Sequence, residues 1–168
     1  MIALVLSIRP DLNWRDVQYL LMTTAVPVSL EDSDWKKTAA GRLFNHKFGY
    51  GSLDAYALVE AAKTFQSLGP QTSFHPPTIT VGHKIPQGSK GISSILTVTR
   101  DDLLAEGVRF GTLEHITVTV NIEHERRGDV EVILLSPNNV ESRLGVRRRF
   151  DTATSGFPNW TFMTVKHW

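Results

Sequence analysis

The repeat of apolar residues changes once along the chain, near residue 70, and this change limits the folds that the chain can adopt. Before residue 70, apolar residues recur at steps of three and four, which is typical of amphipathic helices. After it, apolar and polar residues alternate, as they do in strands with one buried face. Pro76 and Pro77 stand near the start of the second pattern and are typical of a linker. We therefore expect two domains, a helical one over residues 1–69 and an all-β one over residues 70–168.

The first helix with a clear start signal is expected over residues 13–25. Asn13 is its predicted cap, because an amide side chain can accept hydrogen bonds from the free backbone amides of the first turn. The helix dipole favours Asp16 in that turn, and Pro27 ends the helix. The apolar face is expected to consist of Trp14, Val17, Leu20, Leu21 and Thr24.

A second helix is expected over residues 54–65, with Asp54 as its cap. Leu53 and Leu58 have the spacing of a hydrophobic staple, and Gly69-Pro70 is expected to close the segment. The apolar face continues with Ala61, Ala62 and Phe65.

The stretch MIALVLSI at the start is apolar at most positions. It is too short to span a bilayer, and Arg9-Pro10 follows it without the basic start or the small-residue cleavage site of a signal peptide. We expect an uncapped interior helix, cut at its front, whose apolar surface this chain cannot bury alone. Between the helices, the polar loop over residues 31–51 contains Gly49 and Gly51, which permit backbone angles or close approaches that a side chain would forbid.

Strands are expected over residues 78–81, 95–99, 115–124, 130–136 and 160–165, with a turn at residues 136–139. The third and fourth of these are expected to form an antiparallel hairpin across residues 125–129. The pattern favours a β-sandwich or jelly roll, which normally needs about seven strands or more. Because the sequence supplies fewer, we expect an incomplete sandwich.

Composition excludes several kinds of chemistry. The chain has no cysteine, which excludes disulfides, cysteine zinc sites and thiol nucleophiles, and its net charge of +1 nominates no nucleic acid or membrane partner. No G-x-S-x-G, phosphate-binding, dinucleotide or EF-hand motif occurs. We predict no catalytic, cofactor-binding or metal-ligating residue in the chain, and interpret the histidines as solvated or hydrogen-bonded; they are His46, His75, His83, His115, His124 and His167.

Three short patterns have two interpretations each. Arg127-Gly128-Asp129 is a tripeptide that adhesion receptors bind, but between two strands it favours a tight turn. Asn159-Trp160-Thr161 is a glycosylation sequon, but it lies against a strand of large apolar residues that a core would hide, which favours coincidence. The basic clusters at Lys36-Lys37, Arg126-Arg127 and residues 147–149 are typical of solvated faces, with nucleic-acid contacts or processing sites as the alternative.

The chain resembles the kexin and furin family of proprotein convertases, with fungal kexin nearer than the animal enzymes. The resemblance is carried by RPDLNWRDVQYLL, by DWKKTAAGRLFNHKFGYGSLDAYALVEAAKTF and by residues 113–168. It implies that residues 1–69 are the C-terminal part of a subtilisin-like α/β catalytic domain. It also implies that residues 70–168 are a truncated P domain, or Homo B domain, an all-β jelly-roll sandwich that stabilises the catalytic domain.

The same resemblance implies that the reacting residues lie elsewhere. The catalytic serine of the family would stand shortly before Met1, and the catalytic Asp and His, the oxyanion-hole Asn, the calcium sites and the acidic substrate-recognition positions further upstream. No catalytic, cofactor-binding or metal site residue is therefore carried over to this chain. We expect the isolated chain to be inactive, and to be poorly soluble or partly unfolded.

Three functions remain open. The first is part of a calcium-dependent serine endopeptidase of the late Golgi membrane, with the rest of the catalytic domain as intramolecular partner and dibasic precursor proteins as substrates of the parent enzyme. The second is a non-catalytic truncated product, or a module that binds or stabilises a partner. The third is an adhesion or carbohydrate-binding sandwich using Arg127-Gly128-Asp129, against which the helical first segment counts.

Overall fold

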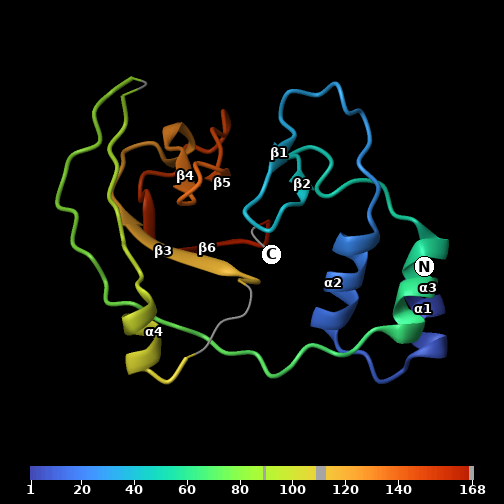
Figure 1. The fold of residues 1–168 in the computed structure, drawn as a ribbon. Coiled ribbons are helices and arrows are strands. Elements are labelled where there is room, and N and C mark those ends of the chain that lie inside the picture. The colour runs from blue at the N-terminus through green and yellow to red at the C-terminus, as the bar shows by residue number, and fades with distance from the viewer. Residues whose placement is uncertain (89, 109–112, 167–168) are drawn as a thin grey trace. The chain divides into compact units, whose positions relative to one another are not determined.

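The structure, a computed structural model, describes residues 1–88, 90–108 and 113–166. The chain divides into two compact units, the first made of Met1–Leu68 with Thr112–Trp168 and the second of Gly69–Gly111. The elements can be followed by label and colour in Figure 1. In chain order they are α1 (Ile2–Ile8), α2 (Trp14–Thr24), β1 (Lys36–Lys37), β2 (Leu43–Phe44), α3 (Ala55–Thr64), α4 (Arg100–Ala105), β3 (Ile116–Ile122), the 3₁₀ turn η1 (Arg127–Asp129), β4 (Val132–Leu135), β5 (Glu141–Gly145) and β6 (Phe157–Thr164).

Both predicted caps are confirmed. The Asn13 side chain accepts hydrogen bonds from the amides of Arg15 and Asp16, at 2.8 and 3.1 Å. The Asp16 carboxylate accepts the Asn13 amide in return at 3.0 Å, which completes a capping box at the start of α2. The Asp54 carboxylate accepts the amide of Ala57 at 2.8 Å and so caps α3.

The end of α3 differs from the prediction. The helix ends at Thr64 and Phe65 is extended, so closure of the helix at Gly69-Pro70 is wrong. The reason is tertiary: the fully buried Asp16 carboxylate accepts the Ser67 hydroxyl at 2.7 Å and the Leu68 amide at 2.8 Å, which holds these residues in an extended path. Burial acts to raise the pKa of Asp16, but these hydrogen bonds outweigh it, and the pKa lies below its usual value.

The carbonyl end of α3 is capped by a side chain from far away in sequence. The Arg9 guanidinium donates to the carbonyls of Ala62 and Phe65, at 2.8 and 2.9 Å. The last carbonyls of a helix lack partners within the helix and carry its partial negative charge, so a guanidinium satisfies both needs. This contact joins the segment after α1 to the end of α3.

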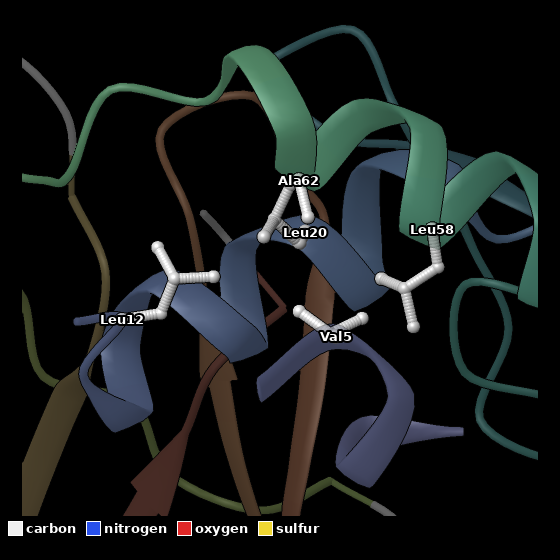
Figure 2. Packing of buried hydrophobic residues seen from close by; sticks show 5 residues of the cluster. All are labelled: Val5, Leu12, Leu20, Leu58 and Ala62. Atoms are coloured by element: carbon white, nitrogen blue, oxygen red, sulfur yellow. The ribbon is translucent and has the colours of Figure 1, made fainter. Parts of the chain in front are cut away.

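The three helices of the first segment share one apolar cluster. Figure 2 shows its five fully or almost fully buried members pointing toward one another from α1, α2, α3 and the α1–α2 connection. The predicted apolar faces of α2 and α3 are confirmed except at Trp14, which is 60% exposed. Leu53 is 55% exposed whereas Leu58 is buried, which argues against the predicted hydrophobic staple between them. The cluster consists of Val5, Leu12, Leu20, Leu58 and Ala62, with Val17, Leu21, Val59, Ala61 and Phe65 packed against it.

Only one side of α1 is buried. Val5 is 1% exposed, whereas the other apolar side chains of the helix are between 38 and 58% exposed. No side chain caps its start. The uncapped, apolar helix expected from MIALVLSI is thus present, and most of its apolar surface is uncovered by the described residues; the uncovered side chains are Ile2, Leu4, Leu6 and Ile8.

The loop between α2 and α3 is more ordered than expected. Lys36 and Lys37 of β1 pair with β2, and Val26 bridges to Ser52. The expectation for Gly51 is confirmed, because its φ is +129° and a Cβ there would lie 2.2 Å from the Val26 carbonyl oxygen.

The β strands of the first unit pair in an order that the sequence did not predict. β3 pairs antiparallel with β6, and β4 pairs antiparallel with β5, so the expected hairpin of the third and fourth predicted strands is wrong. The reason lies at Gly128, where a Cβ would stand 2.2 Å from the Arg148 carbonyl oxygen and 2.4 Å from that of Asp151. The chain leaving β3 is held against the segment before β6, and it cannot turn directly back on itself.

The turn at residues 136–139 and the strand at 160–165 are confirmed as the β4–β5 turn and part of β6. The Asn139 amide donates to the Ser136 carbonyl at 2.8 Å, and Asn139 has a φ of +59°. The jelly-roll sandwich is not confirmed, because the described residues form three two-stranded sheets: β1-β2, β3-β6 and β4-β5.

In the second unit, the strands expected over residues 78–81 and 95–99 are absent from the described structure. Over residues 69–88 and 90–108, the one regular element is α4, which follows residue 99 and was not predicted. The Thr99 hydroxyl accepts the Asp102 amide at 3.2 Å, and the Asp102 carboxylate accepts the Thr99 amide at 2.7 Å. This capping box was visible as Thr-x-x-Asp in the sequence, but the β-branched run before it favoured a strand.

Candidate functional site

Polar contacts join the helical segment of the first unit to its β segment. Asp34, His46 and Tyr50 come from the α2–α3 loop, Arg143 comes from β5, and Lys166 with the Val165 carbonyl follows β6. We call these residues the junction. A shallow hollow of about 190 Å³, lined in part by His46 and Lys166, lies there.

The α2–α3 loop is folded on itself in a way that positions His46. Asn45 is fully buried, and its side chain donates to the Asp32 carboxylate at 3.1 Å and accepts the Lys47 amide at 2.7 Å. The hydrogen bond from the Lys47 ammonium, with those from other groups of the loop, lowers the pKa of Asp32 to about 2. Asn45 and Gly49 also exchange two backbone hydrogen bonds, of 2.9 and 2.8 Å.

Asp34 and His46 form the centre of the junction. The Asp34 Oδ2 accepts the His46 amide at 2.7 Å and lies 2.9 Å from His46 Nδ1. Burial acts to raise the pKa of Asp34, but the hydrogen bonds from His46 outweigh it, so the pKa lies below its usual value. An ionised carboxylate at Nδ1 assigns the Nδ1–H tautomer to a neutral His46, which leaves Nε2 as an acceptor.

That acceptor faces a buried lysine. Lys166 is 2% exposed, and its Nζ lies 3.3 Å from His46 Nε2 and 5.1 Å from the centre of the Phe44 ring. Burial lowers the pKa of Lys166, against the opposing effect of Asp34 and Glu141. Asp34, His46 and Lys166 therefore form one chain of hydrogen bonds from the loop to the end of β6.

Two further contacts belong to the junction. The Tyr50 hydroxyl donates to the Val165 carbonyl at 3.3 Å, and burial raises the pKa of Tyr50 to about 12. The Arg143 guanidinium lies 3.8 Å from Asp34 and the same distance from Glu141. Both contacts again pair the loop with β5 or with the residues after β6.

A buried ion pair joins Arg15 of α2 to Glu114, in the segment just before β3. The Arg15 guanidinium makes two hydrogen bonds to the Glu114 carboxylate, one of them from Nε to Oε2 at 2.8 Å. The two side chains are only 10 and 16% exposed. The bonds from Arg15 lower the pKa of Glu114. Next to them, the Trp14 ring lies against that of His115, tilted by 43° with 5.5 Å between ring centres.

The junction has part of the geometry of a catalytic triad but not its chemistry. In a serine triad, a carboxylate orients histidine through Nδ1 while Nε2 receives the proton of a nucleophilic hydroxyl. Here Nε2 of His46 meets the Lys166 ammonium instead. The nearby hydroxyls of Ser142 and Thr164 are hydrogen-bonded to each other at 3.0 Å. What this arrangement does is bind two parts of the chain to each other.

The other histidines are dispersed. His124 accepts the Arg126 amide through Nδ1 at 3.0 Å, His75 and His83 are exposed, and His167 lies outside the described residues. Among the residues that the structure describes, no group of three or more His, Asp or Glu could hold a metal ion, and no helix is long and apolar enough to cross a membrane.

The Arg127-Gly128-Asp129 tripeptide forms η1 and not the tip of a hairpin, which corrects the predicted strand-to-strand turn. Arg127 donates to both carboxylate oxygens of Asp151, at 2.8 and 3.0 Å, and Gly128 is buried. The hydrogen bond from Arg127 is the main cause that lowers the pKa of Asp151 to about 2. The tripeptide is thus a structural element that fixes the segment before β6.

The basic cluster at residues 147–149 and the sequon have different outcomes. Arg147 is 72% exposed at its side chain, as a solvated face requires, and Arg148 is tied to Asp151 at 3.1 Å. Asn159 and Thr161 are both exposed, so the expectation that a core hides the sequon is wrong.

Comparison with known proteins accounts for this combination of helices and strands. Residues 113–168 match the family model described as the proprotein convertase P-domain. Over 99% of its length, the chain is 46% identical to a dibasic-processing endoprotease of Yarrowia lipolytica and 40% identical to kexin of Saccharomyces cerevisiae. Over its whole length, it is 39% identical to human proprotein convertase subtilisin/kexin type 7. The chain is thus similar, over nearly its whole length, to a segment of the proprotein convertases, and residues 113–168 match their P-domain.

The chain corresponds to a segment of these relatives. It spans about a fifth of the curated relatives named above, between 17 and 21% of their length. Two crystal structures of a serine protease of Aeromonas sobria, one of them in complex with its chaperone, share the fold, with TM-scores of 0.72 and 0.75 over 97 and 99% of this chain. The chain covers 32% of each, at 20 and 21% identity.

Proposed function

We propose that this chain is part of a kexin-like, calcium-dependent serine endopeptidase that processes precursor proteins after paired basic residues in the secretory pathway, at the late Golgi membrane. In this proposal residues 1–69 complete the catalytic domain and residues 70–168 belong to a P domain that stabilises it. The proposal is supported most by the Arg15–Glu114 ion pair, which joins these two segments through a buried contact.

In this proposal each part of the chain has a different structural role. The apolar side chains that α1 leaves exposed would be covered by the remainder of the catalytic domain, because burying apolar surface is the dominant favourable term in such contacts. The junction and the Arg15–Glu114 pair would hold the β segment to that domain. The sheets β3-β6 and β4-β5 would contribute to the two layers of a jelly-roll sandwich.

Peptide hydrolysis itself would be performed by the family's Ser, His, Asp and oxyanion-hole Asn, which the resemblance assigns to sequence outside this chain. Calcium would likewise bind sites outside it. The residues of this chain would act by keeping the catalytic domain folded. Loss of the junction or of the Arg15–Glu114 pair should therefore lower the amount or lifetime of active enzyme more than the cleavage rate of each active molecule.

A segment exchange tests this function. In kexin of Saccharomyces cerevisiae, the segment that matches this chain at 40% identity is replaced by residues 1–168. We expect the secreted hybrid to cleave a fluorogenic peptide after Lys-Arg in a calcium-dependent way. A hybrid that is secreted at the normal level but does not cleave the peptide contradicts the proposal. Glu114→Gln in the hybrid is expected to shorten the half-life of activity on warming and to leave KM unchanged.

The alternative function is a non-catalytic product that binds or stabilises a partner. It is favoured, for the chain taken alone, by the junction geometry in which His46 meets an ammonium instead of a nucleophile. The purified chain with calcium and the same peptide separates the two: we expect no cleavage that a serine-directed inhibitor blocks. The adhesion reading is disfavoured because Arg127 is bound to Asp151 and Gly128 is buried.

A further inference from the structure

Strand β6 contains an irregularity at the sequon. Trp160 pairs with Val120 and Phe157 pairs with Ile122, so Pro158 and Asn159 together lie opposite Asn121. Two residues opposite one are a β-bulge, which locally turns the strand and re-aims its side chains. The bulge is at the edge of the ladder nearest the start of β6.

The backbone of Asn159 is held in a conformation that few residues adopt. Its φ is +45°, in the left-handed region where asparagine is enriched among residues other than glycine. Its amide donates to the Asn121 side-chain carbonyl at 2.6 Å, so the bulge amide is satisfied by a side chain of β3. The backbone is therefore fixed while the Asn159 side chain makes no hydrogen bond among the described residues.

Both recognition groups of the sequon face solvent. Asn159 and Thr161 are exposed, as are Thr119 and Asn121 on the neighbouring strand. The Thr161 hydroxyl meets the Thr119 hydroxyl at 2.8 Å in an exposed position. Trp160 between them is itself 43% exposed, and its ring lies edge-on to that of Phe157 with 5.5 Å between ring centres.

We propose that Asn159 is an N-glycosylation site and that the polar face of the β3-β6 sheet is the surface that carries the glycan. The donor would be a lipid-diphosphate-linked oligosaccharide of the endoplasmic reticulum. The Asn159 Nδ2 forms a bond to the anomeric carbon of the first N-acetylglucosamine. The bond from that carbon to the diphosphate oxygen breaks, its electron pair leaves with the lipid diphosphate, and the proton from Nδ2 passes to a base of the transferase.

The proposal rests on the secretory location in the proposed function, because the donor and the transferase are found only on that route. It is otherwise independent of proteolysis. Asn159-Trp160-Thr161 is the one Asn-x-Ser/Thr triplet in the chain, so any N-linked glycan must be attached there. Because there is a single site, the test reduces to a comparison of two bands, the glycosylated chain and the bare chain.

The test is expression of the chain behind a cleavable signal peptide in yeast. We expect a heavier species that a peptide N-glycanase, an amidase that releases the whole glycan, returns to the mass of the bare chain, under native conditions as well as after denaturation. Peptide mapping after enzymatic release should show Asn159 converted to aspartate. Asn159→Gln and Thr161→Ala should abolish the heavier species, whereas Thr161→Ser should retain it.

Thr119→Ala is the matched control, because it removes the same hydroxyl pair as Thr161→Ala but leaves the sequon intact. It should be glycosylated. Absence of the heavier species from the secreted chain, its persistence in Asn159→Gln, or release of the glycan only after denaturation overturns the proposal. An active kexin hybrid without this glycan would contradict only the proposed glycosylation site. A glycosylated but inactive hybrid would contradict only the proposed function.

Discussion

The helical part of the first unit and its β part are held by different forces. In the helical part, apolar side chains from three helices meet in one cluster around Leu20 and Leu58. In the β part, the fully buried apolar side chain is Phe157, and much of the order comes from guanidinium–carboxylate bonds around Asp151 and from close backbone contacts at Gly128. Apolar burial contains no titrating group and responds little to moderate concentrations of a salt such as NaCl, whereas ion pairs respond to both acid and salt.

The two parts meet through the Arg15–Glu114 pair and the junction, both of which are polar. We infer that these polar contacts couple the two differently built regions into one cooperative structure, and that acid or salt weakens this coupling. The four predictions below run from the largest expected effect to the smallest, and each asks whether this contrast holds.

Arg15→Met should have the largest effect. It leaves the Glu114 carboxylate buried without its guanidinium, and breaking a buried pair in this way costs about 3–5 kcal/mol of the free energy of unfolding. The double variant Arg15→Met with Glu114→Leu should recover part of this loss, since no charge is left unpaired. Urea unfolding at low protein concentration, followed by tryptophan fluorescence, measures both; equal losses in the single and double variants would contradict the role of the pair.

Leu58→Ala should lower the free energy of unfolding by about 2–5 kcal/mol, because it opens a cavity in the apolar cluster. The matched control is Leu4→Ala on α1, where the side chain is 58% exposed and the expected change is within about 0.5 kcal/mol. Urea unfolding of both variants at two salt concentrations should give the same losses at each. A strong salt dependence in Leu58→Ala would break the contrast between the two parts.

Gly51→Ala should destabilise the loop that carries His46, by about 3 kcal/mol, because the new Cβ meets the Val26 carbonyl as well as an unfavourable φ. Gly49→Ala is its control: φ is +61° but the space is open, so the cost should be about 1–2 kcal/mol. The difference between the two losses of unfolding free energy gives the cost of the close approach of the new Cβ to the Val26 carbonyl. Equal costs would show that the loop shifts to accommodate the methyl group.

The smallest effect is the acid response of the β part. The pKa of Asp151 is lowered from 3.8 to about 2, so its contribution to stability is present above about pH 4 and is lost as the pH falls toward 2. Asp151→Asn should remove this part of the pH dependence and lower stability at neutral pH. The midpoints of urea unfolding between pH 2 and pH 5 measure this pH dependence. Asp32→Asn is the comparison variant, which should remove only the pH dependence contributed by the α2–α3 loop.

Local chemistry in the sequence predicted much of the helical part. Asn13 and Asp54 are caps whose partners lie within three residues, and Leu20, Leu58 and Ala62 follow from helical spacing. The same reasoning placed Trp14 on the buried face, which is wrong, because spacing gives the direction of a side chain and not what covers it.

Strand pairing in the β part was beyond local reasoning. The alternation of β3 is correct, but its partner is β6, more than thirty residues away along the chain, because Gly128 must pack against the carbonyls of Arg148 and Asp151. Nothing in the residues 125–129 signals that long-range contact. The Thr99–Asp102 capping box, by contrast, was readable and was outweighed by the β-branched residues before it.

The contacts of the junction gave no sequence signal. His46 and Lys166 are separated by 120 residues, and neither stands in a recognisable motif. The family resemblance was predictable because it rests on whole stretches, while the hydrogen bonds that join the helical and β segments emerge only from the folded chain.

Amide hydrogen exchange in the Leu58→Ala chain tests most directly the claim that the two parts of the first unit form one cooperative structure. The ladder amides of β3 and β6 belong to a sheet, whereas the apolar cluster that contains Leu58 consists entirely of residues of the helical segment. If the Arg15–Glu114 pair and the junction couple the two parts, these amides should lose as much protection, in free energy, as the amides of α2. Unchanged protection of the β3–β6 ladder while α2 loses protection would contradict the claim.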